Sequence, residues 1–206
     1  MKIREKLIAQ ILFLVVLLFN VQPAQADEIG QTVVLSVSPL FSIQKQASSV
    51  ESASANPENG THAGMQTVYD ILTNGTDSDY DITITSKIQT DSGYFSAYGN
   101  NGTLLFGNQT YLPTESDVNK ARIRSAGNKN VIAYPVTTTI TSPMTSTYYG
   151  SYGTYGPCYV IKLNNATHST YNFMVGGTPV ANTYSNTLDE AGSYKSTITF
   201  TVTPKL

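Results

Sequence analysis

The C-terminal stretch Tyr194-Lys195-Ser196-Thr197-Ile198-Thr199-Phe200-Thr201-Val202-Thr203 alternates apolar and polar side chains. Successive side chains of a strand point to opposite faces, so Ile198, Phe200 and Val202 share one face and the threonines share the other. One apolar and one polar face are typical of an antiparallel sheet that packs one side on a core. The stretch therefore predicts a half-buried strand.

Further stretches show the patterns of strands and of the turns between them. Residues 80–88 repeat the alternation, with isoleucines on one face and mostly polar side chains on the other. The pair Asn101-Gly102 is a hairpin signal, because both residue types tolerate the positive φ angles of a tight turn. Only residues 115–124 look locally helical. Strands are also expected at 29–37, 66–73, 93–98, 103–106, 130–140, 158–163 and 171–175.

The composition indicates an all-β chain. Charged residues make up 13% of the sequence, against roughly 25% in ordinary soluble domains, and Thr, Ser, Asn, Gly and Tyr take their place. Many short strands separated by turns predict a β-sandwich or a barrel. The formal net charge is −2, which argues against nucleic acid as a partner, because phosphates attract basic surfaces.

The first 26 residues have the pattern of a secretory signal peptide. Three basic residues precede an apolar run over 7–19, and Ala24-Gln25-Ala26 supplies a small-x-small cleavage site. A signal anchor is the alternative. We expect a single β-sandwich domain over 27–206, secreted into the periplasm and then displayed on the cell surface. Within it, residues 44–64 are rich in Ser, Ala and Asn and predict a long solvated loop.

The cysteine content bears on the type of organism. Cys158 is the single cysteine, so no internal disulfide can form. Small eukaryotic secreted domains usually carry several disulfides, so the chain fits bacterial export better. We expect the thiol to be buried as a small apolar group. A bridge between two chains is the alternative.

The sequence offers little for catalysis, and we expect no catalytic residue, no cofactor and no metal site. It contains two histidines but no Gly-x-Ser-x-Gly motif of a serine hydrolase. Cys158 and His168 could be a nucleophile and its base, yet no glycine-framed motif surrounds the thiol. Residues 77–81 carry Asp at alternate positions, as a calcium loop does, but the Gly and Glu that complete such a loop are absent. We interpret them as a polar turn, and the protein as a non-enzyme.

A run of tyrosines and glycines over 148–159 is the best candidate for a contact surface. Tyr offers rigid amphipathic area at low entropic cost, and Gly lets a loop adapt to a partner. The alternative is that these tyrosines only cover one end of the sandwich. The side chains expected to touch a ligand are Tyr148, Tyr149, Tyr152 and Tyr155.

The two ends of the chain resemble those of chaperone–usher fimbrial (pilin) subunits. The run Thr32-Val33-Val34-Leu35-Ser36-Val37-Ser38-Pro39, followed by 40–43, is similar to the donor strand of the alternate-chaperone colonisation-factor fimbriae. The C-terminal run 191–203 places Gly192 and Tyr194 before an alternating stretch, and it is similar to the closing strand of pilins in general. The chain departs from classical pilins in lacking their disulfide and in being longer than a typical major subunit.

The resemblance implies an immunoglobulin-like antiparallel β-sandwich that lacks one strand and is completed by a donated one. In that family a periplasmic chaperone first fills the gap, an outer-membrane usher assists export, and the next subunit's N-terminal extension then replaces the chaperone. The implied partners are other copies of this chain or sibling subunits, and residues 27–38 would be the donor segment. The donor residues would be Val33, Leu35 and Val37, and the acceptor groove would be lined by Ile198, Phe200 and Val202.

Two functions follow as hypotheses. The first is a structural subunit of a surface fimbria or pilus, assembled by donor-strand exchange and contributing to adhesion. The second is a self-contained secreted adhesin that binds a host glycan or matrix protein through the Tyr/Gly run, with residues 33–37 paired within its own sheet. A chaperone and usher encoded beside the chain would favour the first hypothesis, and saturable glycan binding by a stable monomer would favour the second.

Overall fold

The computed structural model of the chain describes Leu35, Val37, Ser38 and residues 40–205. The described residues from Ser38 onward form one compact unit. The predicted signal peptide and most of the predicted donor segment therefore lie outside the described residues. In the described part of the chain, no helix is both long and apolar enough to cross a membrane.

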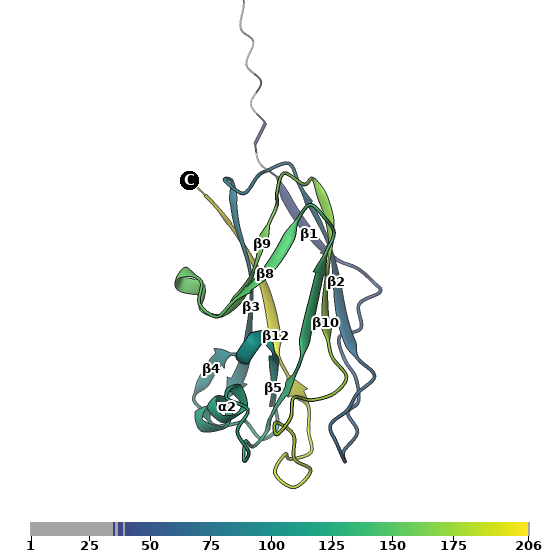
Figure 1. Cartoon of the computed structure of the whole chain (residues 1–206), viewed down its shortest axis with the longest axis vertical. Helices are drawn as coiled ribbons and strands as arrows, with labels where there is room; N and C mark the ends of the chain where they lie inside the picture. Colours follow the sequence, from purple (N-terminus) through teal and green to yellow (C-terminus); the bar gives the residue numbers. More distant parts are fainter. Residues whose placement is uncertain (1–34, 36, 39, 206) are drawn as a thin grey trace, which may run out of the picture. The chain divides into compact units, whose positions relative to one another are not determined.

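Three antiparallel sheets build the compact unit, in agreement with the predicted all-β class (Figure 1). The first sheet has the order β1-β2-β10-β7, and the second has the order β12-β3-β9-β8, with β4 paired to the far end of β3. The third and smallest has the order β11-β5-β6. The bounds are β1 Phe41–Lys45, β2 Met65–Thr73, β3 Tyr80–Thr90, β4 Gly93–Ser96, β5 Leu104–Asn108, β6 Val131–Tyr134, β7 Val136–Ile140, β8 Thr145–Tyr149, β9 Cys158–Lys162, β10 His168–Val175, β11 Tyr194–Lys195 and β12 Thr197–Pro204.

The two larger sheets follow the strand order of the immunoglobulin fold. That fold pairs strands A, B, E and D in one sheet, and C, F and G in the other. Here β1, β2, β10 and β7 take the places of A, B, E and D, whereas β3 and β12 take those of C and F. Strands β4, β5 and β6 and the helix between β5 and β6 are inserted between C and D. The hairpin β8–β9 is inserted between D and E and extends the second sheet beyond β3.

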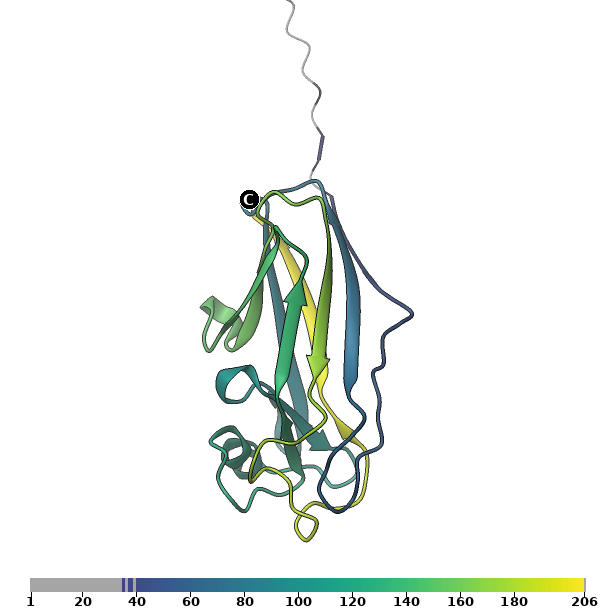
Figure 2. The ribbon, with the colours of Figure 1, turned by 45° about the vertical axis from the view of Figure 1, so that its right-hand side comes forward.

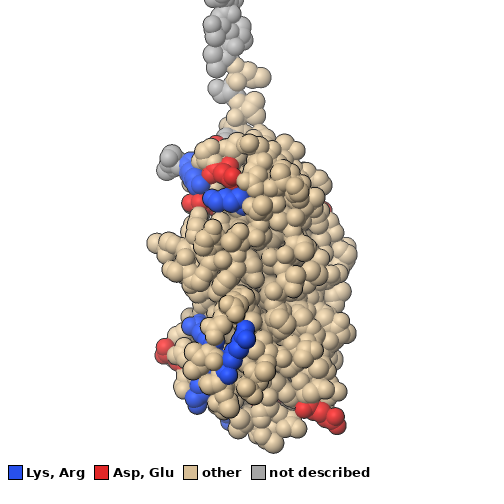
Figure 3. Space-filling view, in the orientation of Figure 1, with Lys and Arg blue, Asp and Glu red and all other residues tan. Residues whose placement is uncertain are grey.

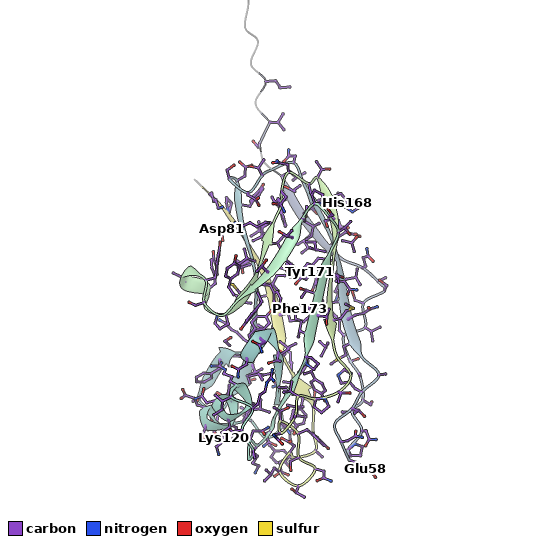
Figure 4. The ribbon with its side chains drawn as sticks, viewed as in Figure 1. Glu58, Asp81, Lys120, His168, Tyr171 and Phe173 are labelled. Atoms are coloured by element: carbon purple, nitrogen blue, oxygen red, sulfur yellow. The ribbon has the colours of Figure 1, made fainter. Side chains whose placement is uncertain are left out.

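The core lies between the two larger sheets. Tyr171 and Phe173 point from β10 into this layer and are almost fully buried (Figure 4). Tyr159 of β9 meets Phe173 edge-on, with 6.1 Å between the ring centroids. Ile82 and Ile84 of β3 fill the layer from the opposite side, as the alternation in 80–88 predicts. These contacts hold the two sheets face to face.

The predicted helix and the predicted tight turn are both confirmed. Helix α2 (Glu115–Arg122) begins after Thr114, whose hydroxyl accepts the backbone N–H of Asp117 while the Asp117 carboxylate accepts the N–H of Thr114. This reciprocal capping satisfies donors that the first helical turn leaves open. Asn101 and Gly102, within the 3-10 turn η1 (Asn100–Gly102), have φ values of 54° and 74°. They form the turn between β4 and β5 for which this residue pair is suited.

Three details of the predicted strands are wrong. The stretch 194–203 is split, because β11 pairs with β5 in the third sheet whereas β12, from Thr197, pairs with β3 in the second. Residues 130–140 form two strands in different sheets, because Pro135 separates β6 from β7 and has no N–H to continue a ladder. Strand β8 was not expected, since its Thr- and Ser-rich sequence gives little apolar alternation.

The predicted loop over 44–64 contains no long strand, and most of its side chains are exposed. Its first two residues belong to β1. The segment runs down the side of the molecule next to β2 (Figure 2). Its far end is tied to the body, because the Tyr134 hydroxyl donates to the Gly60 carbonyl at 2.6 Å and the Tyr184 hydroxyl donates to the Pro57 carbonyl.

Candidate functional site: an open groove along β12

Strand β12 lies at an edge of the second sheet. One side pairs with β3 over eight residues, from Thr197 opposite Lys87 to Pro204 opposite Tyr80. Among the described residues, no strand pairs with its other side. In an immunoglobulin fold, strand G would pair with this side of F. The backbone groups of β12 that point away from β3 are therefore free to pair with another strand.

The core-facing side of β12 is only partly covered. Ile198, Phe200 and Val202 share this side, as the alternation predicts, and all three are half-buried against the core. The ring of Phe200 lies 4.4 Å from that of Tyr69 and 5.6 Å from that of Tyr171, between ring centroids. The three residues predicted to line an acceptor groove are thus brought together on one apolar surface at the margin of the sandwich.

A groove continues this surface beyond the start of β12. A hollow of about 330 Å³ lies next to Ile198, and a second of about 480 Å³ lies next to Tyr194. Both are bordered by Met65, Phe106 and Lys195, so they adjoin each other and together line one depression. We call this depression, together with the core-facing side of β12, the open groove. Its far wall is the segment 50–55.

The far wall continues a segment that covers the neighbouring edge of β2. Strand β1 pairs with this edge from Thr73 to Tyr69. Beyond it, the Gln46 N–H donates to the Val68 carbonyl at 2.8 Å, the Val68 N–H donates to Ser49 Oγ at 3.0 Å, and Val50 exchanges backbone hydrogen bonds with Gln66. Of the two edges at the groove, only β12 therefore has free backbone groups among the described residues. An extended peptide lying in the groove could pair with β12 and bury its alternate side chains in the hollows.

The polar groups at the groove are few. Glu51 and Lys195 border both hollows. Burial raises the pKa of Tyr69, and the neighbouring Glu51 carboxylate raises it further. Burial also raises the pKa of Tyr194 to about 12, and its hydroxyl donates to the Glu190 carbonyl at 2.8 Å. Both phenols are therefore neutral at ordinary pH, and the groove presents apolar and hydroxyl surface to an occupant.

Two of the three predicted donor residues can be examined. Val33 lies outside the described residues. Leu35 and Val37 are 85% and 71% exposed, and neither belongs to a strand. Their side chains therefore have most of their surface available to another molecule.

The structure separates the four tyrosines predicted to touch a ligand. Tyr148 turns toward the interior, where its ring centroid lies 5.3 Å from that of Tyr159 and 5.8 Å from that of Tyr98. Its hydroxyl donates to the Gly99 carbonyl at 3.2 Å. The other three lie on the outer side of the second sheet: Tyr149, Tyr152 and Tyr155.

The residues considered for catalysis do not converge. Cys158 is buried on β9, and burial raises the pKa of its thiol. His168 lies exposed at one end of β10, in the other sheet, 3.7 Å from an Asp70 carboxylate oxygen (Figure 4). Cys158 and His168 therefore do not lie together as a nucleophile and its general base. Among the described residues, no group of three or more His, Cys, Asp or Glu side chains could hold a metal ion.

The aspartates of 77–81 each have a separate structural partner. The Asp77 carboxylate accepts the backbone N–H of Leu163 at 2.6 Å. Asp79 accepts the hydroxyl of Thr76 at 2.8 Å, which lowers its pKa together with the backbone hydrogen bond from the same residue. Asp81 lies 3.3 Å from the Lys205 ammonium. The segment is a polar turn that enters β3, as interpreted from the sequence.

The hollows also involve residues that the sequence reasoning did not single out. Val50, Met65, Phe106, Phe173 and Val175 all line the hollow beside Ile198. The four that belong to strands are apolar residues that pack on the core, whereas Val50 is an exposed loop residue, and nothing local indicates that any of them borders an unfilled edge. No protein-family model, curated protein or solved structure matches this chain.

Proposed function

We propose that the chain is a structural subunit of a bacterial surface fimbria, assembled by donor-strand exchange and contributing to adhesion. The observation that carries the proposal is the free edge of β12, whose apolar side is only half-buried and opens onto the groove. A stable self-contained sandwich would cover or blunt such an edge, because unpaired strands promote aggregation. We therefore expect another chain to fill the open groove in the assembled protein.

The N-terminal segment of a second copy is the occupant that fits. Residues 27–38 have the length of one strand, about 40 Å when extended, and carry no proline. Val33, Leu35 and Val37 repeat at intervals of two, so all three would face the core when the segment lies along β12. Pairing of this kind combines main-chain hydrogen bonds with side chains that fill alternate pockets.

The expected partners follow from this mechanism. Before the segment of a neighbour arrives, the groove needs a temporary occupant, for which a periplasmic chaperone is the expected protein. An outer-membrane usher is the expected site of exchange. The protein itself carries out no catalysis in this scheme, and its assembly depends on strand pairing alone.

The test is the oligomeric state of residues 27–206 secreted to the periplasm, measured by size-exclusion chromatography with light scattering. We expect ladders of oligomers, or monomers bound to a chaperone. Leu35→Asp should abolish the ladders, because it puts a charge on the core-facing side of the donor strand, whereas Ser36→Asp, on the opposite side, should not. A stable, cooperatively melting monomer without helpers would make the proposal wrong.

A further inference from the structure

A loop crosses the outer side of the second sheet. Residues 150–157, which include the 3-10 turn η2 (Gly153–Tyr155), connect β8 to β9 and stand out beside them (Figure 1). At its far end, the Tyr155 hydroxyl lies 3.1 Å from the Thr203 hydroxyl of β12. Since β8 and β12 are the two opposite edges of the sheet, the loop reaches over the width of the sheet.

The loop also covers the sheet beneath it. Thr83 pairs with Val160, and Cys158 pairs with Tyr149, so all have the parity of the outer side. Thr83, Cys158 and Val160 are nevertheless buried. We attribute this burial to the loop, which is the segment that crosses them. The loop is therefore tied to β12 at its far end by the Tyr155 hydroxyl.

Three tyrosine rings form a row on this loop. The ring centroids of Tyr149 and Tyr152 are 5.3 Å apart, and those of Tyr152 and Tyr155 are 6.3 Å apart with the planes within 24°. Tyr149 is 40% exposed, and the other two are partly exposed. These separations are comparable to the length of one sugar unit. A row of three aromatic rings thus lies at least partly exposed on the outer side of the sheet, outside the core between the two larger sheets.

The segment that carries the row is uncharged and rich in hydroxyl groups. Residues 145–159 contain no Asp, Glu, Lys, Arg or His. Figure 3 shows charged side chains gathered toward the two ends of this face and a bare middle. Near the Tyr155 end, Asp81 is the strand partner of Thr203 and is neutralised by the Lys205 ammonium at 3.3 Å. The lack of unpaired charge in the segment disfavours an ionic ligand, and the exposed hydroxyls of Ser151 and Thr154 can exchange hydrogen bonds with a polar neutral one.

We propose that the Tyr149–Tyr152–Tyr155 row is a binding site for a neutral oligosaccharide. The apolar C–H face of a sugar ring packs on an aromatic face, while its hydroxyls reach the polar rim. Tyr combines an apolar face with a polar end. The row offers up to three consecutive platforms, so affinity should rise from mono- to tri-saccharide. This site lies on the outer side of the sheet and does not rest on donor-strand exchange.

The test uses the secreted chain 27–206 on an array of immobilised neutral oligosaccharides built from glucose, galactose or N-acetylglucosamine. We expect saturable binding to at least one of them. Tyr149→Ala should weaken that binding about tenfold by removing one stacked ring, and Tyr149→Phe should retain most of it. The matched controls are Tyr94→Ala and Tyr111→Ala, which remove exposed tyrosines outside the row and should change binding by less than about twofold.

Thermal melting of each variant separates lost binding from lost folding, and Tyr149→Ala should melt with the parent because its ring lies at the surface. Binding to none of the neutral oligosaccharides would overturn the proposal. Equal binding by the parent and Tyr149→Ala would also overturn it, as would binding only to an immobilised matrix protein stripped of its glycans. None of these results would alter the oligomer ladders that test the fimbrial assembly.

Discussion

The donor segment should bind the open groove through Leu35, and a single truncation there should have a large effect. Leu35 is 85% exposed in its own chain, so nearly all of its burial would come from the neighbouring subunit. Leu35→Ala removes three carbon groups, worth about 2.4 kcal/mol at ~0.8 kcal/mol per buried CH₂. The dissociation constant should therefore rise roughly fiftyfold.

The assay is fluorescence anisotropy of a labelled peptide of residues 27–38, titrated with a chain that lacks residues 1–38. Ser36→Ala is the matched control, because its side chain has the opposite strand parity and should change affinity by less than about twofold. The reasoning is refuted if the parent peptide does not bind, or if Leu35→Ala and Ser36→Ala weaken binding equally.

Three further predictions concern the fold that holds the groove. Burial raises the pKa of Asp189 from 3.8 to about 6, so between these pH values the folded chain holds a proton that the unfolded chain has lost. The free energy of unfolding should therefore fall as the pH rises from about 4 to 6. In urea titrations across this range, Asp189→Asn should remove that part of the pH dependence, and an unchanged pH dependence would contradict the assignment. Asn108 is fully buried; its amide nitrogen donates to the Glu190 carbonyl and its amide oxygen accepts the N–H groups of Thr110 and Tyr111, all at 2.8–3.0 Å. Asn108→Ala should lower the free energy of unfolding, measured in urea, by about 3 kcal/mol. A decrease below about 0.5 kcal/mol would count against this role. Gly102 has φ 74°, and an added Cβ would lie 2.6 Å from the Tyr159 hydroxyl. Gly102→Ala should therefore lower the free energy of unfolding by about 2 kcal/mol, whereas Gly150→Ala, at a position with no atom nearby, should have almost no effect. Equal melting temperatures for the two variants would contradict the prediction.

The local patterns identified most strands and their faces, but not which strands pair with each other. Alternation in 80–88 and 194–203 correctly placed isoleucines and Phe200 on the core side, because parity depends only on the period of a strand. The split of 130–140 between two sheets at Pro135 was missed, since the apolar run 131–134 leads directly into the alternating run 136–140 while the ladder stops at the proline. Strand β8 was missed because its apolar signal is weak.

The groove shows the same division between local and long-range information. The shared face of Ile198, Phe200 and Val202 follows from the sequence. That this face lies at a free edge depends on where every other described strand pairs, which no local pattern contains. Likewise, composition predicted that residues 44–64 are solvated, but the hydrogen bonds from Tyr134 and Tyr184 that hold this segment come from distant parts of the chain.

The free edge of β12 is tested most directly by amide hydrogen exchange, measured by NMR on the chain without residues 1–38, before and after adding the peptide 27–38. The amides of β12 alternate between pointing toward β3 and pointing away from it. We predict that the outward set exchanges fast in the chain alone and becomes protected when the peptide is bound. Outward amides that are already protected without the peptide, or that remain unprotected with it, would contradict the account.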